Sequence, residues 1–339
     1  MRVALLAHDR FPDRAKTAVG VLRYSDHEVV AVVDRRTAGG RVRDHLDDVQ
    51  DAPIVASFEE VPPVEALVIG VAPIGGGFEP SWRPDVRAAI EAGCDVIAGL
   101  HYLLAEDEAF AALAAEHGVE LRDVRVPPDD LTVSEGIVRD LDVDVVLTVG
   151  TDCSVGKMTT TMELVEALRA RGVDAGAIPT GQTGILIEGW GIAVDRVISD
   201  FAAGAVERMI RQRADEHDLL VVEGQGSITH PAYSGVTCSI LHGAMPDGLV
   251  LCHVAGREVV HGYEDFDLPG LNEVAALYER LARPVAPTAL VGAALNTSGL
   301  GDAEARSAVD RVEHDLGVAC ADPVRHGADD LAEAIEAWA

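Results

Sequence analysis

The sequence predicts an α/β protein built from two domains, each with a largely parallel β-sheet. Apolar, β-rich runs alternate with helical stretches along the chain, which is typical of parallel sheets covered by helices. The chain has 339 residues, the length of about two globular domains. A Pro-Pro-Asp-Asp linker at 127–130 separates the two series, because neither proline can continue a helix or donate to a sheet. We therefore place the domains at 1–127 and 128–339.

The first domain is expected to be Rossmann-like. Helices are predicted at 85–93 and 106–118, and each ends at a glycine. The first strand is not followed by a G-x-G-x-x-G turn, since no glycine precedes Gly20, so ordinary dinucleotide binding is not expected. The predicted strands span 2–7, 29–33, 66–71 and 95–100.

The second domain is expected to be a doubly wound parallel sheet. Its strands are almost continuous runs of Val, Leu and Ile, as expected for strands that are buried on both faces. Each strand except the last is followed by a helix or a long loop. The predicted strands span 143–150, 172–179, 218–224, 248–253 and 288–296.

The segment VDVVLTVG-TDCSVGK-MTTT predicts a buried strand, a glycine-bounded loop and a helix. Backbone N–H groups of such a loop bind phosphate, and Lys157 adds a positive charge, so we interpret it as a P-loop in a P-loop NTPase-like sheet. It departs from G-x-x-x-x-G-K-[ST] in two ways: five residues separate Gly150 from Gly156, and Met158 replaces the magnesium-binding hydroxyl. The residues expected to bind the cofactor here are Gly150, Thr151, Asp152, Cys153, Ser154, Val155, Gly156, Lys157, Met158, Thr159 and Thr160.

A magnesium site is predicted beside the P-loop. Glu223 ends the strand 218–224, where a carboxylate can hold Mg²⁺ directly or through water. Either Asp195 or Asp200 could complete the metal shell, and we favour Asp200. Because Met158 has no hydroxyl, Thr159 or Thr160 must substitute. The expected ligands are Thr159, Asp200 and Glu223.

Lysine is scarce, with only Lys16 and Lys157 among the 27 basic residues. A lysine that persists in such a composition suggests a compact point charge that the planar arginine fork cannot replace. Lys157 lies where a P-loop needs that charge. By the same argument Lys16 is a second candidate site residue.

The net charge excludes several classes of partner. Lys+Arg 27 against Asp+Glu 57 gives −30, so nucleic acid and anionic membranes are not expected to be attracted. No apolar run reaches the roughly 18–20 residues of a membrane-spanning helix. The five cysteines show neither disulfide-framework nor zinc spacing. We expect a cytoplasmic protein with free thiols that forms a homo-oligomer, and the Asp-rich, Lys-poor composition indicates adaptation to high salt.

Two resemblances add to this interpretation. GTDCSVGK with VVEGQG resembles the dethiobiotin synthetase branch of P-loop proteins over about 80 residues, and in that comparison Asn296 matches a base-reading asparagine. Over the whole chain, GTDCSVGKMTT, PTGQTG, VISDFAAGAVE, VVEGQGSITHP and ALNTS, together with a Rossmann-like first domain, resemble a P-loop family in which a D-glutamate N-acetyltransferase has been recognised.

The second resemblance implies acetyl transfer from acetyl-CoA to the amine of D-glutamate, in D-amino acid catabolism. Such a reaction needs a base, donors for the thioester oxyanion and cations for two carboxylates. We assign His230 as the base and Gln182 and Thr183 as the oxyanion donors. Lys157 also belongs to the predicted catalytic residues. Arg257 and Lys16 are expected to bind the substrate carboxylates. Alternatives are an ATP-dependent ligase or kinase acting on a small carboxylate, with ATP and Mg²⁺, and a nucleotide-regulated switch.

The net charge of −30 predicts that the stability of the protein depends on salt. Like-charge repulsion should be screened as KCl rises to about 2 M, so the melting temperature should increase steeply over that range. Calorimetry at a series of KCl concentrations measures it. A melting temperature that stays flat or falls would remove the argument for salt adaptation.

Overall fold

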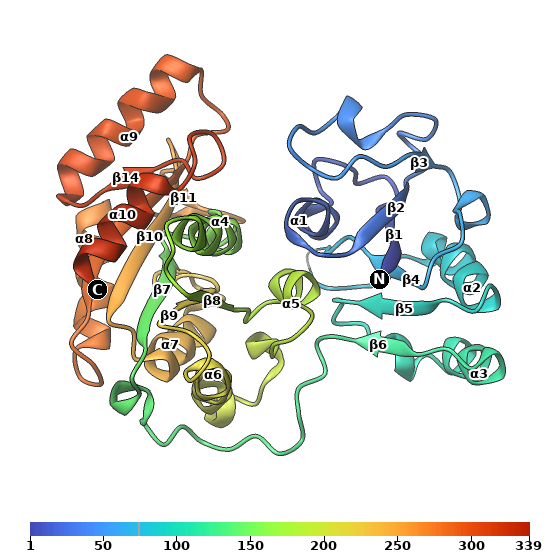
Figure 1. Cartoon of the computed structure of the whole chain (residues 1–339), viewed down its shortest axis with the longest axis horizontal. Helices are drawn as coiled ribbons and strands as arrows, with labels where there is room; N and C mark the ends of the chain where they lie inside the picture. Colours follow the sequence, from blue (N-terminus) through green and yellow to red (C-terminus); the bar gives the residue numbers. More distant parts are fainter. Residues whose placement is uncertain (74) are drawn as a thin grey trace. The chain divides into compact units, whose positions relative to one another are not determined.

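The computed structural model describes residues 1–73 and 75–339, which divide into two compact units (Figure 1). Unit 1 comprises Met1–Pro127 with Gln182–Ala193, and unit 2 comprises Pro128–Gly181 with Val194–Ala339. Each unit contains a six-stranded sheet with helices, so the predicted α/β class is confirmed. In the described parts of the chain, every helix is too short or too polar to cross a lipid bilayer.

Unit 1 has the strand order of a Rossmann-like sheet. The order is β3-β2-β1-β4-β5-β6, and all neighbours are parallel. Its strands are β1 (Arg2–Leu6), β2 (Glu28–Val33), β3 (Ile54–Val55), β4 (Ala66–Ile69), β5 (Asp95–Ala98) and β6 (Leu121–Asp123). Its helices are α1 (Lys16–Tyr24), α2 (Arg83–Glu91), α3 (Glu108–His117) and α5 (Gln182–Glu188), with 3₁₀ turns at Val42–Asp44, Phe58–Glu60, Pro80–Trp82 and Leu104–Glu106.

The two edge strands of this sheet were not predicted from the sequence. β3 and β6 have two and three residues, which is too short for a hydrophobic period to be recognised. The four inner strands are predicted within a few residues of their observed bounds.

The segment Gln182–Ala193 is grouped with unit 1, so the two compact units do not follow a single cut of the chain. Helix α5 packs on α1, and the hydroxyls of Thr17 and Thr183 are 3.0 Å apart. Arg125 donates to the side-chain oxygen of Gln182 at 2.7 Å. A Cβ at Gly99 would lie 2.8 Å from the Gln182 side chain, so the glycine makes room for this docking. These partners are distant in sequence, and no local pattern indicates them.

Unit 2 has the order β14-β13-β10-β7-β9-β8, again parallel throughout, with α4 and α10 on one side and α6 and α7 on the other (Figure 1). Its strands are β7 (Asp144–Gly150), β8 (Ala175–Ile178), β9 (Leu219–Val222), β10 (Gly248–Val254), β13 (Ala289–Asn296) and β14 (Cys320–Ala321). An antiparallel hairpin is formed by β11 (Val259–Val260) and β12 (Tyr263–Asp267). The helices are α4 (Lys157–Ala170), α6 (Ser199–Arg213), α7 (Ser234–Ala244), α8 (Leu271–Ala282), α9 (Asp302–Leu316) and α10 (Asp329–Trp338), with 3₁₀ turns at Val138–Asp140 and Val194–Arg196.

The five strands predicted for this unit correspond to β7, β8, β9, β10 and β13. β8 and β9 are buried at every position, as their apolar composition predicts. The two-residue β14 and the hairpin were not predicted. The hairpin strand β12 is exposed at every residue and lacks the alternation that marks a half-buried strand.

The segment that enters unit 2 is held by the buried carboxylate of Glu207, on α6. It accepts hydrogen bonds from the backbone N–H groups of Glu135, Gly136 and Ile137 at 2.7–3.0 Å and from the hydroxyl of Ser134 at 2.9 Å. Burial favours a higher pKa for Glu207, but these donors outweigh it and lower the pKa overall. The charged carboxylate therefore stabilises the fold.

Removing this carboxylate should destabilise the protein. Glu207→Ala leaves several buried donors without an acceptor, so we expect a loss of about 3 kcal/mol in the free energy of unfolding. Because the folded pKa is depressed, the contribution should be complete above the ordinary pKa of 4.5, should begin to fall below it, and should be lost as the pH drops through the lower pKa of the folded protein. Urea unfolding at pH 7 and pH 4 measures both effects. Glu216→Gln, on an exposed ion pair, is the control, and equal losses in the two variants would contradict the assignment.

Candidate functional site

The strand, loop and helix of the predicted P-loop are all present in unit 2. β7 ends at Gly150, α4 begins at Lys157, and the intervening backbone is left-handed at Ser154 (φ 52°) and Gly156 (φ 103°). A Cβ at Gly150 would lie 2.8 Å from both Lys157 Nζ and the Val155 side chain. Both glycines of the motif are therefore required by the geometry, one by close approach and one by its φ angle.

Lys157 is 6% exposed and folds back across the loop that precedes it. Its Nζ donates to the carbonyl oxygen of Asp152 at 2.9 Å. Its own carbonyl accepts from the Thr161 hydroxyl at 3.0 Å, and that hydroxyl also contacts Thr148 on β7. The ammonium group is thus fixed beside the loop, where it can neutralise phosphate.

Asp152 organises the loop from within. Its buried carboxylate accepts from the backbone N–H groups of Cys153 (2.7 Å) and His261 (2.8 Å) and from the Arg257 guanidinium (3.1 Å). Arg257 also donates to the Cys153 carbonyl at 2.9 Å. The structure therefore places Arg257 against the P-loop, an arrangement that its predicted role as a substrate clamp does not explain.

Two side chains that support the loop, the buried Tyr278 and the half-buried His253, were not predicted from the sequence. The Tyr278 hydroxyl donates to the Gly150 carbonyl at 2.9 Å and accepts from the Ile228 N–H at 3.3 Å, and burial raises its pKa to about 12. His253 contacts the Thr151 hydroxyl through Nδ1 at 2.8 Å, and burial lowers its pKa to about 4. A tyrosine on an amphipathic helix gives no sequence signal that distinguishes it from a core residue.

His230 lies beside this loop and is 1% exposed. Its Nδ1 accepts from the Ala232 N–H at 3.1 Å, whereas its Nε2 has no hydrogen-bond partner among the described residues. The nearest carboxylate oxygen, Oδ1 of Asp152, is 3.8 Å from Nε2. Burial lowers the His230 pKa, and the Asp152 charge opposes that shift. The Tyr233 and Tyr263 rings flank the imidazole, with centroids at 4.5 and 5.2 Å.

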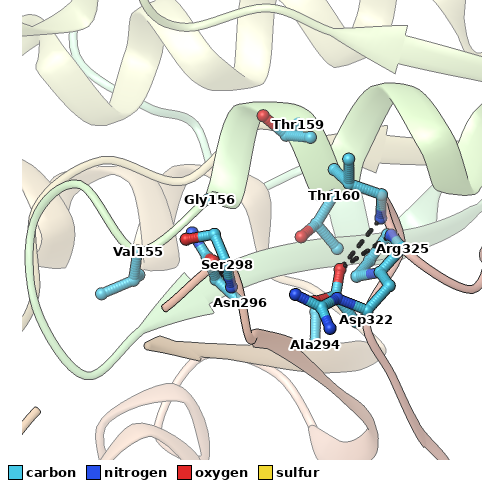
Figure 2. Close-up of a pocket in the computed structure, with 11 residues that line it drawn as sticks. Val155, Gly156, Thr159, Thr160, Ala294, Asn296, Ser298, Asp322 and Arg325 are labelled. Atoms are coloured by element: carbon cyan, nitrogen blue, oxygen red, sulfur yellow. Dashed lines mark hydrogen bonds between the residues drawn. The ribbon is translucent and has the colours of Figure 1, made fainter. Parts of the chain in front are cut away.

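A pocket of about 420 Å³ opens at the N-terminus of α4 (Figure 2). This volume lies within the range of small-molecule sites. Five of the predicted cofactor residues line it: Val155, Gly156, Thr159, Thr160 and Asn296. The remaining lining residues were not predicted: Ala294, Ser298, Asp322, Pro323, Val324 and Arg325.

The far wall of the pocket is fixed by Asp322. Its carboxylate accepts from Thr297 N at 2.9 Å and Oγ1 at 2.5 Å, and from the backbone N–H groups of Val324 and Arg325 at 3.2 and 3.1 Å. Asn296 accepts from the Ser298 N–H at 3.0 Å, so its side-chain oxygen caps a turn while its NH₂ group remains a donor at the pocket. The pocket therefore presents a fixed wall and an amide donor.

The carboxylate of Glu223 is buried and orders the loop that follows β8. Oε2 of Glu223 accepts from the backbone N–H groups of Thr180 and Gly181 at 3.2 and 3.1 Å. The backbone carbonyl of Glu223 accepts from the Thr180 hydroxyl at 2.6 Å. Asp200 is exposed in the first turn of α6, where a negative charge stabilises the helix dipole. The set Thr159, Asp200 and Glu223 stays a prediction.

Within the described residues, one group of potential metal ligands comes together, formed by Asp152, Cys153 and His230. It does not fit a metal ion well. Both Asp152 oxygens already accept hydrogen bonds, and burial, followed by the Asp152 charge, raises the pKa of the Cys153 thiol. Nδ1 of His230 is occupied by a backbone donor, which leaves the hydrogen of a neutral ring on Nε2.

The other predicted site residues lie in unit 1. Lys16 is exposed at the start of α1, and Thr183 and Gln182 make the α5 contacts described above. Asp34, which was not predicted as a site residue, directly follows β2, where a ribose-binding acid would lie, and its carboxylate accepts from Asp9 N, Thr37 N and Thr37 Oγ1. This acid is thus engaged in a turn, which agrees with the missing glycine fingerprint.

Comparison with known proteins identifies one family for both parts of the chain. Residues 35–127 match a Rossmann-like domain and residues 132–332 match a P-loop domain, each described as a domain of unknown function, DUF1611_N and DUF1611_C. A crystal structure of a DUF1611 family protein from Anabaena variabilis has a TM-score of 0.93 with 39% identity, and the match covers 99% of each chain.

Two curated proteins are similar over most of the chain. A D-glutamate N-acetyltransferase of Tritonibacter scottomollicae is 42% identical over 279 residues, which are 80% of this chain and 81% of the relative. A protein of the same name from a Pseudoalteromonas species is 37% identical over 268 residues, which are 79% of this chain and 80% of the relative.

The geometry predicts how Lys157 contributes to binding. Lys157→Ala removes a fixed cation, so the dissociation constant for ADP should rise at least about tenfold. The side chain faces a loop rather than an apolar core, so the melting temperature should change little. Calorimetric titration and thermal unfolding measure the two quantities, with the exposed Arg280→Ala as control. An ADP affinity that stays within twofold would exclude the P-loop as the phosphate site.

Proposed function

This chain belongs to the DUF1611 family of P-loop proteins and is an N-acetyltransferase, and from that premise we propose that it transfers the acetyl group of acetyl-CoA to the amine of D-glutamate, in the breakdown of D-amino acids. The amine nitrogen attacks the thioester carbonyl carbon, a C–N bond forms, and the C–S bond breaks. The CoA thiolate leaves and is protonated, and the nitrogen loses a proton. The products are N-acetyl-D-glutamate and CoA.

The single observation that carries the choice of donor is the pocket beside the P-loop. CoA contains adenosine diphosphate, so a phosphate cradle next to a pocket for a base suits its nucleotide part. In this proposal the loop and Lys157 hold the pyrophosphate, while Asn296 directs its NH₂ group to the adenine ring. Lys16 is proposed to bind a carboxylate of the amino acid.

Met158 favours a donor that is bound rather than hydrolysed. It is 4% exposed, and it follows Lys157 directly, where P-loop NTPases carry the hydroxyl that holds Mg²⁺. An apolar, buried side chain at this position supplies no ligand. A P-loop that serves only to bind pyrophosphate does not need that hydroxyl.

The competing hypothesis is an ATP-dependent ligase or kinase that acts on a small carboxylate. The buried Glu223 at the tip of β9 favours it, because a carboxylate at this position can serve a nucleotide-bound Mg²⁺. ATP would occupy the same loop and pocket. The two hypotheses differ in the product that each one releases.

One assay separates them. The protein is incubated in molar KCl with D-glutamate and either acetyl-CoA or ATP with Mg²⁺, while free thiol and ADP are followed separately. We expect thiol release with acetyl-CoA that depends on D-glutamate, and no ADP release. L-Glutamate is the control for chirality. ADP release that depends on D-glutamate, without thiol release, would contradict acetyl transfer and support the ligase or kinase.

A further inference from the structure

The two ring nitrogens of His230 have different surroundings. Nδ1 accepts a hydrogen bond from the backbone N–H of Ala232, and a backbone N–H can only donate. Nδ1 must therefore carry its lone pair. In a neutral ring the hydrogen then lies on Nε2, which is buried and has no hydrogen-bond partner in the described part of the chain.

This arrangement opposes the base role that the sequence predicts for His230. A base needs an open lone pair, and the lone pair on Nδ1 is already used by Ala232. Protonation would place an N–H of the ring against the N–H of Ala232. The lowered pKa, caused first by burial, agrees with a ring that stays neutral near pH 7. The Asp152 charge and the backbone of His261 oppose the shift, whereas the Lys157 charge adds to it.

A buried donor without a partner is unfavourable unless a ligand completes it. Oδ1 of Asp152 is 3.8 Å from Nε2, beyond hydrogen-bond distance, and already accepts from Cys153. The Tyr233 and Tyr263 rings flank the imidazole, and Asp152 belongs to the P-loop itself. An acceptor oxygen of a molecule bound at this loop would supply the partner that Nε2 lacks.

We propose that Nε2–H of His230 donates to the carbonyl oxygen of the acetyl thioester and stabilises the oxyanion that forms when the amine attacks. This assignment rests on the proposed acetyl transfer. The carbonyl oxygen gains negative charge as the C–N bond forms and loses it as the C–S bond breaks. The hydrogen bond is therefore strongest while the oxygen carries this negative charge. His230 neither gains nor loses a proton.

Two isosteric substitutions distinguish a donor from a base. His230→Gln can place an N–H near the position of Nε2 but cannot act as a base. His230→Asn can accept from Ala232 through its oxygen but has no donor at Nε2. We expect kcat to fall by about 100-fold in His230→Asn and by less than about tenfold in His230→Gln, with the wild-type pH profile retained in the latter. Equal, severe losses in both variants would overturn the proposal.

Binding of CoA, which lacks the acetyl group, tests which oxygen is recognised. His230→Asn should bind CoA within about twofold of wild type. If its CoA affinity falls as much as its kcat, the acceptor is a phosphate oxygen and the thioester assignment is wrong. His242→Gln, on α7, is the matched control, and its kcat and CoA affinity should remain at wild-type values.

Nitrogen-15 NMR of the histidine rings tests the protonation state without an assay of activity. His230 should show hydrogen on Nε2, as should His242, which donates from Nε2 to the Leu281 carbonyl. His217 is the opposite reference, because its Nδ1 donates to Asp174 at 2.7 Å. Hydrogen on Nδ1 of His230 would overturn the donor role even if acetyl transfer is shown. If the NMR places the hydrogen on Nε2 but the assay shows no thiol release, the proposed function is rejected, and the thioester is rejected as the acceptor.

Discussion

The site depends on one buried residue, Asp152. Its carboxylate binds Arg257 and the backbone of His261, and its carbonyl binds Lys157. These contacts join the P-loop to the segment between β10 and β12 and fix the position of the lysine. Loss of this carboxylate would remove the contacts that fix the backbone of the loop, and it would change the surroundings of His230.

The charges at the loop explain how an acidic protein can bind an anion. The chain carries a net charge of −30, yet the loop sets two cations, Lys157 and Arg257, against the single carboxylate of Asp152. The nearby His253 is held neutral by burial, with a pKa of about 4. The proposed phosphate binding would therefore be a local property of the loop and the α4 N-terminus, and the global charge would oppose it.

The parts of the fold that follow from local pattern could be predicted from the sequence. The β7–loop–α4 unit and the long inner strands each carry their signal in consecutive residues. The supports of the site could not be predicted, because Tyr278 meets Gly150 across 128 positions and Arg257 meets Asp152 across 105. The placement of α5 in unit 1 also depends on distant contacts, such as Thr17 with Thr183. His230 was identified from its position in the sequence, but the role of its ring follows from one backbone contact that the sequence does not reveal.

In the proposed reaction the P-loop holds the pyrophosphate of acetyl-CoA. Steady-state inhibition by ADP tests it most directly, because ADP carries the same adenosine and pyrophosphate groups without the acyl arm. We expect ADP to compete with acetyl-CoA, so that the apparent KM for acetyl-CoA rises with ADP while kcat is unchanged. Inhibition that leaves this KM unchanged, or no inhibition at ADP concentrations that saturate the loop, would contradict it.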